Sequence, residues 1–158
     1  MSIHPGLREL LDRHRATYAV LPAPGADPNS PFPASGRIPP RTVSRTMVIR
    51  QGPGLSLAVL PGNLRLDLPR LSAALHDHVR LADPREIGVT FPDWDADAVP
   101  PFGLLYGLKT YVDETLTHER HIIFHAGTVH DVIRMPFEDY RRVAAPVVLW
   151  LSESMAGA

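Results

Sequence analysis

Proline is concentrated in one stretch of the chain, residues 22–40, where seven of the nineteen residues are proline. Proline has no backbone N–H and a fixed φ, so neither a helix interior nor a central strand can pass through such a segment. We expect a long irregular loop here, partly in the polyproline II conformation; a proline-rich ligand motif for another protein is the alternative. The regular elements must therefore lie outside this stretch.

Outside it, short helices and strands are mixed along the chain. Residues 45–51 and 55–61 are rich in strand-forming residues and flank a Gly-Pro-Gly turn, which predicts a hairpin. The same patterns predict strands at 17–21, 79–82, the start of 109–116, 120–127 and 131–135, helices within 4–18, after 67, at 83–91 and at 136–145, and a turn or docked tail at 147–153. About six strands and four helices without regular alternation favour an α+β fold with a mixed sheet over a doubly wound α/β sheet.

Two of the predicted helices carry start signals. Asp67 is suited to cap a helix that holds Pro69 in its first turn. Asp83, Pro84 and Glu86 form the pattern of a capping box with proline at the first helical position. These local signals indicate where both helices begin.

Composition excludes several classes of function. The 158-residue chain suggests one domain, 1–158, with 22–40 as the proline-rich loop and 147–158 as a C-terminal tail. The absence of cysteine excludes disulfides, thiolate metal sites and a cysteine nucleophile. The net charge of −1 gives no overall attraction to nucleic acid, and the sequence shows neither a signal peptide nor a membrane span. We therefore expect a cytoplasmic protein with no DNA or membrane partner.

A second segment that contains prolines, AVPPFGLLYG (98–107), carries no charge. Pro100, Pro101 and Gly103 interrupt any helix or strand there, so we predict a loop. The question it raises is which apolar surface or cavity such an uncharged loop faces.

The sequence contains few catalytic motifs. No serine lies in a Gly-x-Ser-x-Gly elbow, and no phosphate-binding loop is present. Four histidines lie between residues 118 and 130, but the apolar residues 122–124 favour a strand, on which His121 and His125 lie too far apart for one metal ion. We therefore expect neither a metal nor a cofactor, and we place the histidines at the surface or at the edge of a pocket.

The order of several short motifs resembles the YbaK/prolyl-tRNA-synthetase-associated domain family, whose members hydrolyse mischarged aminoacyl-tRNA. The motifs are a basic residue followed by Thr at 45–46, Ala-Val-Leu-Pro at 58–61, R-x-D-L at 65–68, R-L-A-x-x-x-E-I at 80–87, Pro-Phe-Gly at 101–103, Tyr-Val-Asp at 111–113 and Phe-x-Ala-Gly at 124–127. The resemblance extends from about residue 18 to residue 143. It implies a mixed, barrel-like β-sheet of about six strands with flanking helices.

The resemblance also implies a site. Arg45 would be the catalytic residue, orienting the ester or the terminal phosphate, while pocket shape and backbone donors position the substrate for attack by a water or a group of the substrate itself. The loop 98–107 would form a wall of the pocket, with Phe102 packed behind it. The residues that would bind the substrate are Thr46, Asp97, Pro100, Pro101, Phe102, Gly103, His125, Ala126, Gly127, Thr128 and His130.

Several residues at this site differ from the family pattern. Arg45 stands where lysine is usual, and a guanidinium fork does not freely replace a compact ammonium. Asp97 replaces the first glycine of a Gly-x-x-x-Pro loop, where glycine permits positive φ and close approach of a ligand. Val129 stands where a histidine is common, and His130 follows it.

Three hypotheses remain. The first is a free-standing editing deacylase that hydrolyses the ester of a mischarged tRNA carrying a small amino acid; its partners would be the 3′ end of aminoacyl-tRNA and a synthetase. The second is a non-catalytic relative that binds tRNA, a synthetase or another protein. The third is a hydrolase of an unrelated small ester. The arginines that could form a basic patch for tRNA are Arg8, Arg13, Arg15, Arg37, Arg41 and Arg45.

Overall fold

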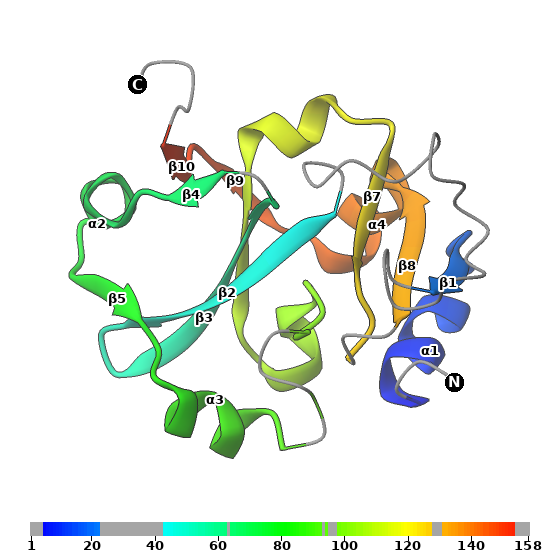
Figure 1. Cartoon of the computed structure of the whole chain (residues 1–158), viewed down its shortest axis with the longest axis horizontal. Helices are drawn as coiled ribbons and strands as arrows, with labels where there is room; N and C mark the ends of the chain where they lie inside the picture. Colours follow the sequence, from blue (N-terminus) through cyan, green and yellow to red (C-terminus); the bar gives the residue numbers. More distant parts are fainter. Residues whose placement is uncertain are drawn as a thin grey trace.

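A five-stranded mixed sheet lies at the centre of the computed structural model, which describes residues 5–22, 43–62, 64–92, 94, 98–127 and 131–153 (Figure 1). Its strands, in spatial order, are β5 (Val79–Leu81), β2 (Ser44–Gln51), β3 (Gly54–Pro61), β6 (Lys109–Asp113) and β9 (Val147–Leu149). Strand β2 pairs antiparallel with β3 and β5, whereas β6 pairs parallel with β3 and β9. The predicted hairpin of β2 and β3 is confirmed.

A second, antiparallel sheet contains β1 (Ala19–Pro22), β8 (Asp131–Pro136) and β7 (His121–His125). Its junction with the first sheet lies at the start of β2. There Val43 forms an isolated parallel bridge with Ile123, and the Ser44 hydroxyl donates to the Ile123 carbonyl at 3.0 Å. The position of β2 relative to β7 is therefore set at one end of β2.

The predicted α+β class and mixed sheet are confirmed, but the expected barrel-like sheet is not a closed barrel. The described residues contain ten strands in three sheets, more than the six or so expected. The third sheet is a pair of two-residue strands, β4 (Arg65–Leu66) and β10 (Ser152–Glu153). Such short strands have no periodic signal of their own and depend on partners far along the chain.

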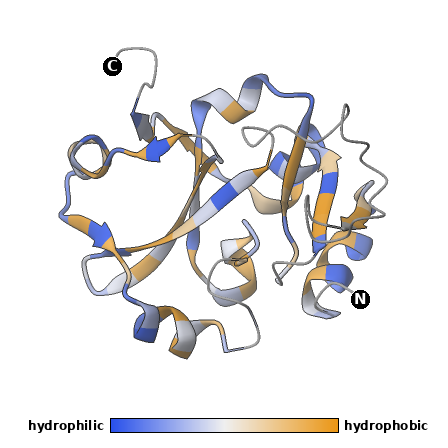
Figure 2. Cartoon of the chain, in the orientation of Figure 1, coloured by the Kyte–Doolittle hydropathy of each residue, from blue (hydrophilic) through white to orange (hydrophobic). Residues whose placement is uncertain are grey.

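In the described part of the chain, four α-helices flank the sheets: α1 (Pro5–Arg13), α2 (Leu68–Leu75), α3 (Pro84–Thr90) and α4 (Phe137–Ala144). Both predicted start signals are confirmed: Asp67 accepts from Arg70 N, and Asp83 and Glu86 form a reciprocal capping box. Hydrophobic and hydrophilic residues alternate around α1 and α3 (Figure 2), as expected for helices that cover a core on one side. None of the helices in the described ranges is long and apolar enough to cross a membrane.

The five-stranded sheet is buried on both faces. Val48 and Leu57 belong to a large hydrophobic cluster that also includes α1, α4 and the second sheet. Their neighbours Ile49 and Ala58 belong to a smaller cluster with Leu71 of α2. This alternation follows from the two-residue period of a strand, and it places successive residues of β2 on opposite sides of the sheet.

Residues 147–153, expected to be a turn or docked tail, form β9 and β10 and are held by the fully buried Asp113. Its carboxylate accepts hydrogen bonds from the backbone N–H groups of Leu151 at 2.7 Å and Ser152 at 3.1 Å, and from the Ser152 hydroxyl at 3.1 Å. The backbone N–H and hydroxyl of Thr115 also donate to it. Because five donors converge on one carboxylate, its charge is well compensated inside the protein.

We predict that Asp113→Asn lowers the free energy of unfolding by about 2–4 kcal/mol, because the amide nitrogen would face donors and leave some of them without an acceptor. Urea denaturation of the variant measures the loss. The control is Glu114→Gln, an exposed neighbour that should change stability by less than about 0.5 kcal/mol. Equal stability of D113N and E114Q would show that the carboxylate does not hold the C-terminal strands.

Candidate functional site

A cavity of about 380 Å³ lies beside the edge of β2 that faces away from β3. Strand β5 covers this edge only along residues 49–51, and the bridge to β7 covers it at Val43. Between these points, the edge of Arg45–Met47 has no strand partner among the described residues and lines the cavity. An uncovered strand edge presents backbone donors and acceptors that a ligand can use.

The direction of these backbone groups follows from the pairing of β2. The carbonyl of Val48 accepts from Ala82 N at 2.9 Å, so it points away from β3. In an antiparallel ladder, inward-directed and outward-directed residues alternate along the strand. The N–H and C=O of Thr46, two residues earlier, therefore also point away from β3 and into the cavity.

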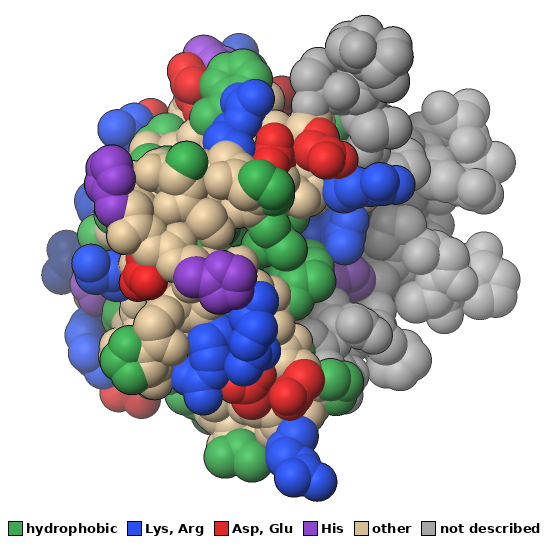
Figure 3. Space-filling view, turned by 90° about the vertical axis from the view of Figure 1, so that its left-hand side faces the viewer, with side chains coloured by type: hydrophobic (Ala, Val, Ile, Leu, Met, Phe, Trp, Pro, Cys, Tyr) green, Lys and Arg blue, Asp and Glu red, His purple; other side chains and the backbone are tan. Residues whose placement is uncertain are grey.

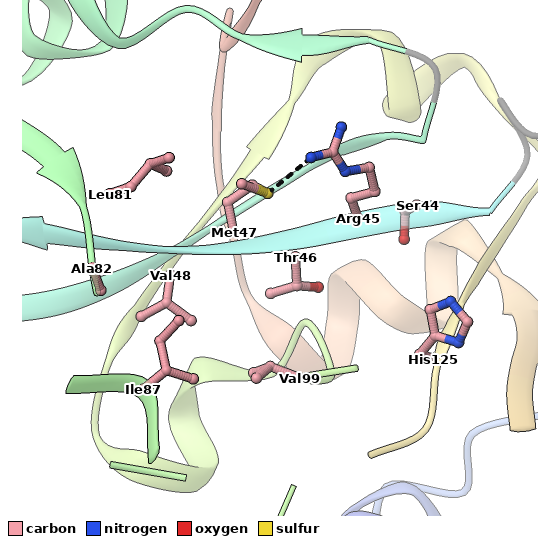
Figure 4. A pocket seen from close by; sticks show the side chains of 10 residues that line it. All are labelled: Ser44, Arg45, Thr46, Met47, Val48, Leu81, Ala82, Ile87, Val99 and His125. Carbon is pink, nitrogen blue, oxygen red and sulfur yellow. Dashed lines mark hydrogen bonds between the residues drawn. The ribbon is translucent and has the colours of Figure 1, made fainter. Parts of the chain in front are cut away.

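Side chains of β2 divide between the two faces of the sheet at this point. Figure 4 shows Thr46 and Val48 on one side of β2, together with Val99 and His125. Arg45 and Met47 rise from the opposite side, where Leu81 lies. The guanidinium of Arg45 lies 3.5 Å from the carbonyl oxygen of Leu64 and 3.5 Å from Met47 Sδ, and the side chain is exposed.

The uncharged loop faces both the cavity and the core. Val99 lines the cavity, and Pro100–Gly103 are buried. Residues Gly103–Tyr106, which the sequence predicted as loop, form a short 3-10 helix in which Leu104 is exposed. Phe102 packs edge-on against Phe124 and Tyr140, with ring centroids 5.4 and 5.3 Å apart. The Tyr140 hydroxyl donates to the Pro101 carbonyl at 2.9 Å, and burial raises the pKa of this phenol. Pro100, Pro101 and Phe102 thus support the cavity wall from behind.

Gly103 is required by close packing at the end of this loop. Its N–H donates to Thr110 Oγ1 at 2.9 Å. A Cβ at this position would lie 2.5 Å from the Leu108 carbonyl oxygen and 2.6 Å from Thr110 Oγ1. The glycine therefore lets the loop close onto β6, which keeps Val99 in place.

The turn after β7 joins the second sheet to the same loop. His125 is half-buried and lines the cavity, whereas Ala126 and Gly127 are buried. Gly127 N donates to the Ala98 carbonyl at 3.0 Å. Gly127 has φ +98°, and a Cβ there would lie 2.3 Å from Cε3 of Trp94. Glycine is thus needed at 127 for its backbone conformation and for the close approach of the indole.

Helix α3 contributes Ile87 to the cavity, and ion pairs around Glu86 hold the helix against β2 and β5. Arg80 donates to the Glu86 carboxylate at 3.0 Å, the backbone N–H of Asp83 at 2.9 Å and Arg50 at 2.6 Å. These donors, of which Arg80 has the largest effect, lower the pKa of Glu86 to about 2.

Three of the site residues predicted from the sequence, Arg45, Thr46 and His125, meet at the cavity. Pro100–Gly103, Ala126 and Gly127 lie behind its wall. Asp97, Thr128 and His130 lie outside the described residues. The sequence prediction missed the lining residues Ser44, Met47, Val48, Leu81, Ala82, Ile87 and Val99, most of which carry only the apolar character of strand and helix positions.

Comparisons with known proteins agree with this architecture. The profile of the family described as "Aminoacyl-tRNA editing domain" matches residues 31–143. A structure described as "a putative trans-editing enzyme for prolyl tRNA synthetase" is 22% identical, with a TM-score of 0.76 over 97% of this chain and 100% of that chain. No curated protein gives a significant match.

Two further solved structures share the fold. A hypothetical protein is 19% identical, with a TM-score of 0.79 over 94% of this chain and 99% of that one. A structure from Marinobacter aquaeolei described as "a Putative signal transduction protein" is 19% identical, with a TM-score of 0.77 over 98% of this chain but only 32% of the other. At these identities, the structural similarity establishes the fold and nothing further.

We predict that Gly127→Ala destabilises the protein by about 1–3 kcal/mol, because alanine is strained at this φ and its Cβ would collide with Trp94. Urea denaturation measures the loss, and tryptophan fluorescence in a Trp150→Phe background reports any displacement of Trp94. Gly88→Ala is the matched control, since no atom lies within 4 Å of a Cβ there and alanine favours the helix α3. If G127A is as stable as G88A, the close packing at Gly127 is not required.

The low pKa of Glu86 predicts how stability depends on pH. A carboxyl whose pKa is lower in the folded than in the unfolded protein stabilises the fold above its unfolded pKa of about 4.5, and this contribution is lost as the pH falls to about 2. Glu86→Gln should therefore unfold at lower urea concentration at neutral pH and lose less stability over that acid range. Glu138→Gln, in the first turn of α4, is the control; parallel pH profiles for E86Q and the unsubstituted protein would contradict the prediction.

Proposed function

The chain belongs to the aminoacyl-tRNA editing domain family, as the order of its motifs predicted, and on this premise we propose that it is a trans-editing deacylase. It would hydrolyse the ester between a mischarged small amino acid and the 3′ end of a tRNA. We propose the cytoplasm as its compartment, because tRNA is charged there, and an aminoacyl-tRNA synthetase as a further partner.

The observation that carries the proposal is the cavity at the open edge of β2. Thr46 offers it both backbone hydrogen-bonding groups and a hydroxyl, whereas Val48, Ile87 and Val99 give it apolar walls. Backbone groups fixed in a sheet are oriented before the substrate arrives, so they can hold an ester and stabilise the charge that develops on its carbonyl oxygen.

The size of the cavity supports a small aminoacyl group. Its volume of about 380 Å³ lies near the lower end of the range for small-molecule sites. The aminoacyl group and part of the terminal ribose would fill it. We propose that the apolar walls select small amino acids by excluding larger side chains sterically. The binding energy of one methylene group alone would discriminate only modestly between amino acids.

We propose that Arg45 binds a phosphate of the tRNA end. Its side chain leaves β2 on the face opposite Thr46, away from the space where the ester would lie (Figure 4). Its contacts to Leu64 and Met47 are long, so most of its five N–H donors remain for an anionic group. Asp97, Thr128 and His130 remain proposed substrate-binding residues on the family resemblance.

This face carries arginines that could contact tRNA, and three of them are ion-paired: Arg65 with Glu153, Arg70 with Asp67 and Arg80 with Glu86. Figure 3 shows Arg and Lys side chains, interspersed with Asp and Glu, on both sides of a central hydrophobic stretch, on the face that carries α2, β4, β5 and α3. The exposed arginines of these elements are Arg65, Arg70, Arg80 and Arg85. Helix α1, with Arg8 and Arg13 of the patch suggested by the sequence, lies at the other end of the molecule (Figure 1). Arg37 and Arg41 lie outside the described residues.

One observation favours the second hypothesis, a family member that binds tRNA without hydrolysing it. Lysine is usual where Arg45 stands, and the Arg45 side chain leaves β2 on the side opposite Thr46 and His125. A screen separates the hypotheses: tRNAs mischarged with alanine, serine or cysteine are incubated with the protein, and the remaining ester is measured against a buffer blank. Cleavage of at least one above the blank supports the deacylase, whereas tRNA retention without cleavage supports the binding protein. Cleavage of aminoacyl esters that lack tRNA, at comparable efficiency, would favour a small-ester hydrolase.

We predict that Arg45→Ala lowers kcat/KM for a mischarged tRNA by about 10-fold to 100-fold, because the variant loses a hydrogen bond between two charged groups. It should leave the hydrolysis of the matching 3′-O-aminoacyl-adenosine, which has no phosphate, unchanged. Arg134→Ala, an exposed arginine on β8, is the control and should leave both substrates unaffected. A loss of equal size on both substrates would instead assign Arg45 to the ester.

A further inference from the structure

We propose that His125 is the general base of this site: its imidazole takes the proton from the water that attacks the ester. The inference rests on the proposed deacylase function and adds a catalytic residue to it. It is carried by the position of His125 in the cavity and by the chemistry of the groups that surround the cavity.

Few groups at the cavity can exchange a proton. Of its described lining residues, only Arg45 and His125 carry ionisable side chains; the others are Ser44, Thr46 and apolar residues. A guanidinium stays protonated at neutral pH, and hydroxyl groups are weak bases. Imidazole changes its charge between about pH 5 and pH 8, so His125 is the described lining residue suited to accept a proton from water.

His125 is also held in place. It is the last residue of β7, opposite Val132 of β8. Beyond it, Ala126 N donates to the Asp131 carbonyl at 3.1 Å and Gly127 N to the Ala98 carbonyl at 3.0 Å. The backbone is thus fixed on both sides of this residue. Figure 4 shows the imidazole on the same side of β2 as the Thr46 hydroxyl, where we place the ester.

Among the described residues, Arg134 shares the face of His125, because it lies opposite Ile123 and two residues after Val132, whereas Arg45 and Asp131 lie on other faces. Arg45 leaves β2 on the opposite side (Figure 4). Asp131 precedes Val132, the partner of His125, so it points to the other face of its sheet. Helix α4 packs Tyr140 against Phe124, on the other face of β7. His121 shares the face of His125 but lies about 13 Å along the strand.

The proposed reaction is hydrolysis of the aminoacyl ester by water, with His125 first accepting and then returning a proton. As His125 accepts a proton from water, the water oxygen bonds to the carbonyl carbon of the aminoacyl ester. The bond from that carbon to the ribose oxygen then breaks, and the ribose oxygen takes the proton from the imidazolium. The products are the free amino acid and a tRNA with a free hydroxyl, and His125 returns to its neutral form.

The test uses His125→Ala and His125→Asn with a mischarged tRNA that the unsubstituted protein cleaves, taken from the alanine, serine and cysteine set. We expect kcat to fall about 100-fold or more with little change in KM. We expect kcat of the unsubstituted protein to fall toward acid pH; this fall should disappear in both variants, and added imidazole should restore part of the rate to H125A. The control is His121→Ala, which should keep both the rate and the pH profile.

The possible outcomes separate the two proposals. Unchanged pH dependence in H125A and H125N, a loss confined to KM, or an equal loss in H121A overturns the role of His125 while the deacylase function stands. Circular dichroism and urea denaturation of H125N show whether a loss comes from unfolding; if H125N is folded and as active as the unsubstituted protein, His125 is not the base. If the unsubstituted protein cleaves none of the three tRNAs, the proposed function fails and this inference fails with it.

Discussion

The open edge of β2 is the constraint on which the site depends. A strand inside a sheet has its backbone groups paired on both sides, and such groups are not available to a ligand. Here β5 covers only the far end of β2, and the second sheet meets β2 only near Val43 and Ser44. Between these contacts, the backbone N–H and C=O of Thr46 therefore face the cavity, while Arg45 and Met47 direct theirs toward β3, which holds the segment rigidly on the other side.

The wall of the cavity opposite β2 is formed by the loop 98–107. Its residues 98–103 are buried, so the polar groups of their backbone need hydrogen-bond partners inside the protein. Prolines remove some donors from this loop, and side chains of the core satisfy groups that remain: Tyr140 binds the Pro101 carbonyl, and Thr110 accepts from Gly103. The Gly127 N–H then pairs with Ala98. The wall thus consists of irregular backbone at 98–102, followed by the 3-10 helix Gly103–Tyr106, and it is anchored to α4, to β6 and to the turn at Gly127.

Local chemistry explains what the sequence predicted. The Asp83–Glu86 capping box and the Gly-Pro-Gly hairpin depend on residues a few positions apart, and both are confirmed. Strands β9 and β10 depend on β6, β4 and the buried Asp113, which are remote in sequence, so periodicity could not find them. Alternation along β2 does predict that Arg45 and Thr46 point to opposite sides, but the side on which the cavity lies depends on where α3 and the loop 98–107 pack.

The two faces of β2 suggest why arginine is compatible with a position that usually holds lysine. On the face of Met47 and Leu81, where we propose that Arg45 binds a phosphate, a planar fork suits the contact at least as well as an ammonium. Chemistry at the ester then has to come from the other face, where Thr46 and His125 lie. If both proposals hold, one strand would separate recognition of the nucleic acid, at Arg45, from reaction at the ester, near Thr46 and His125.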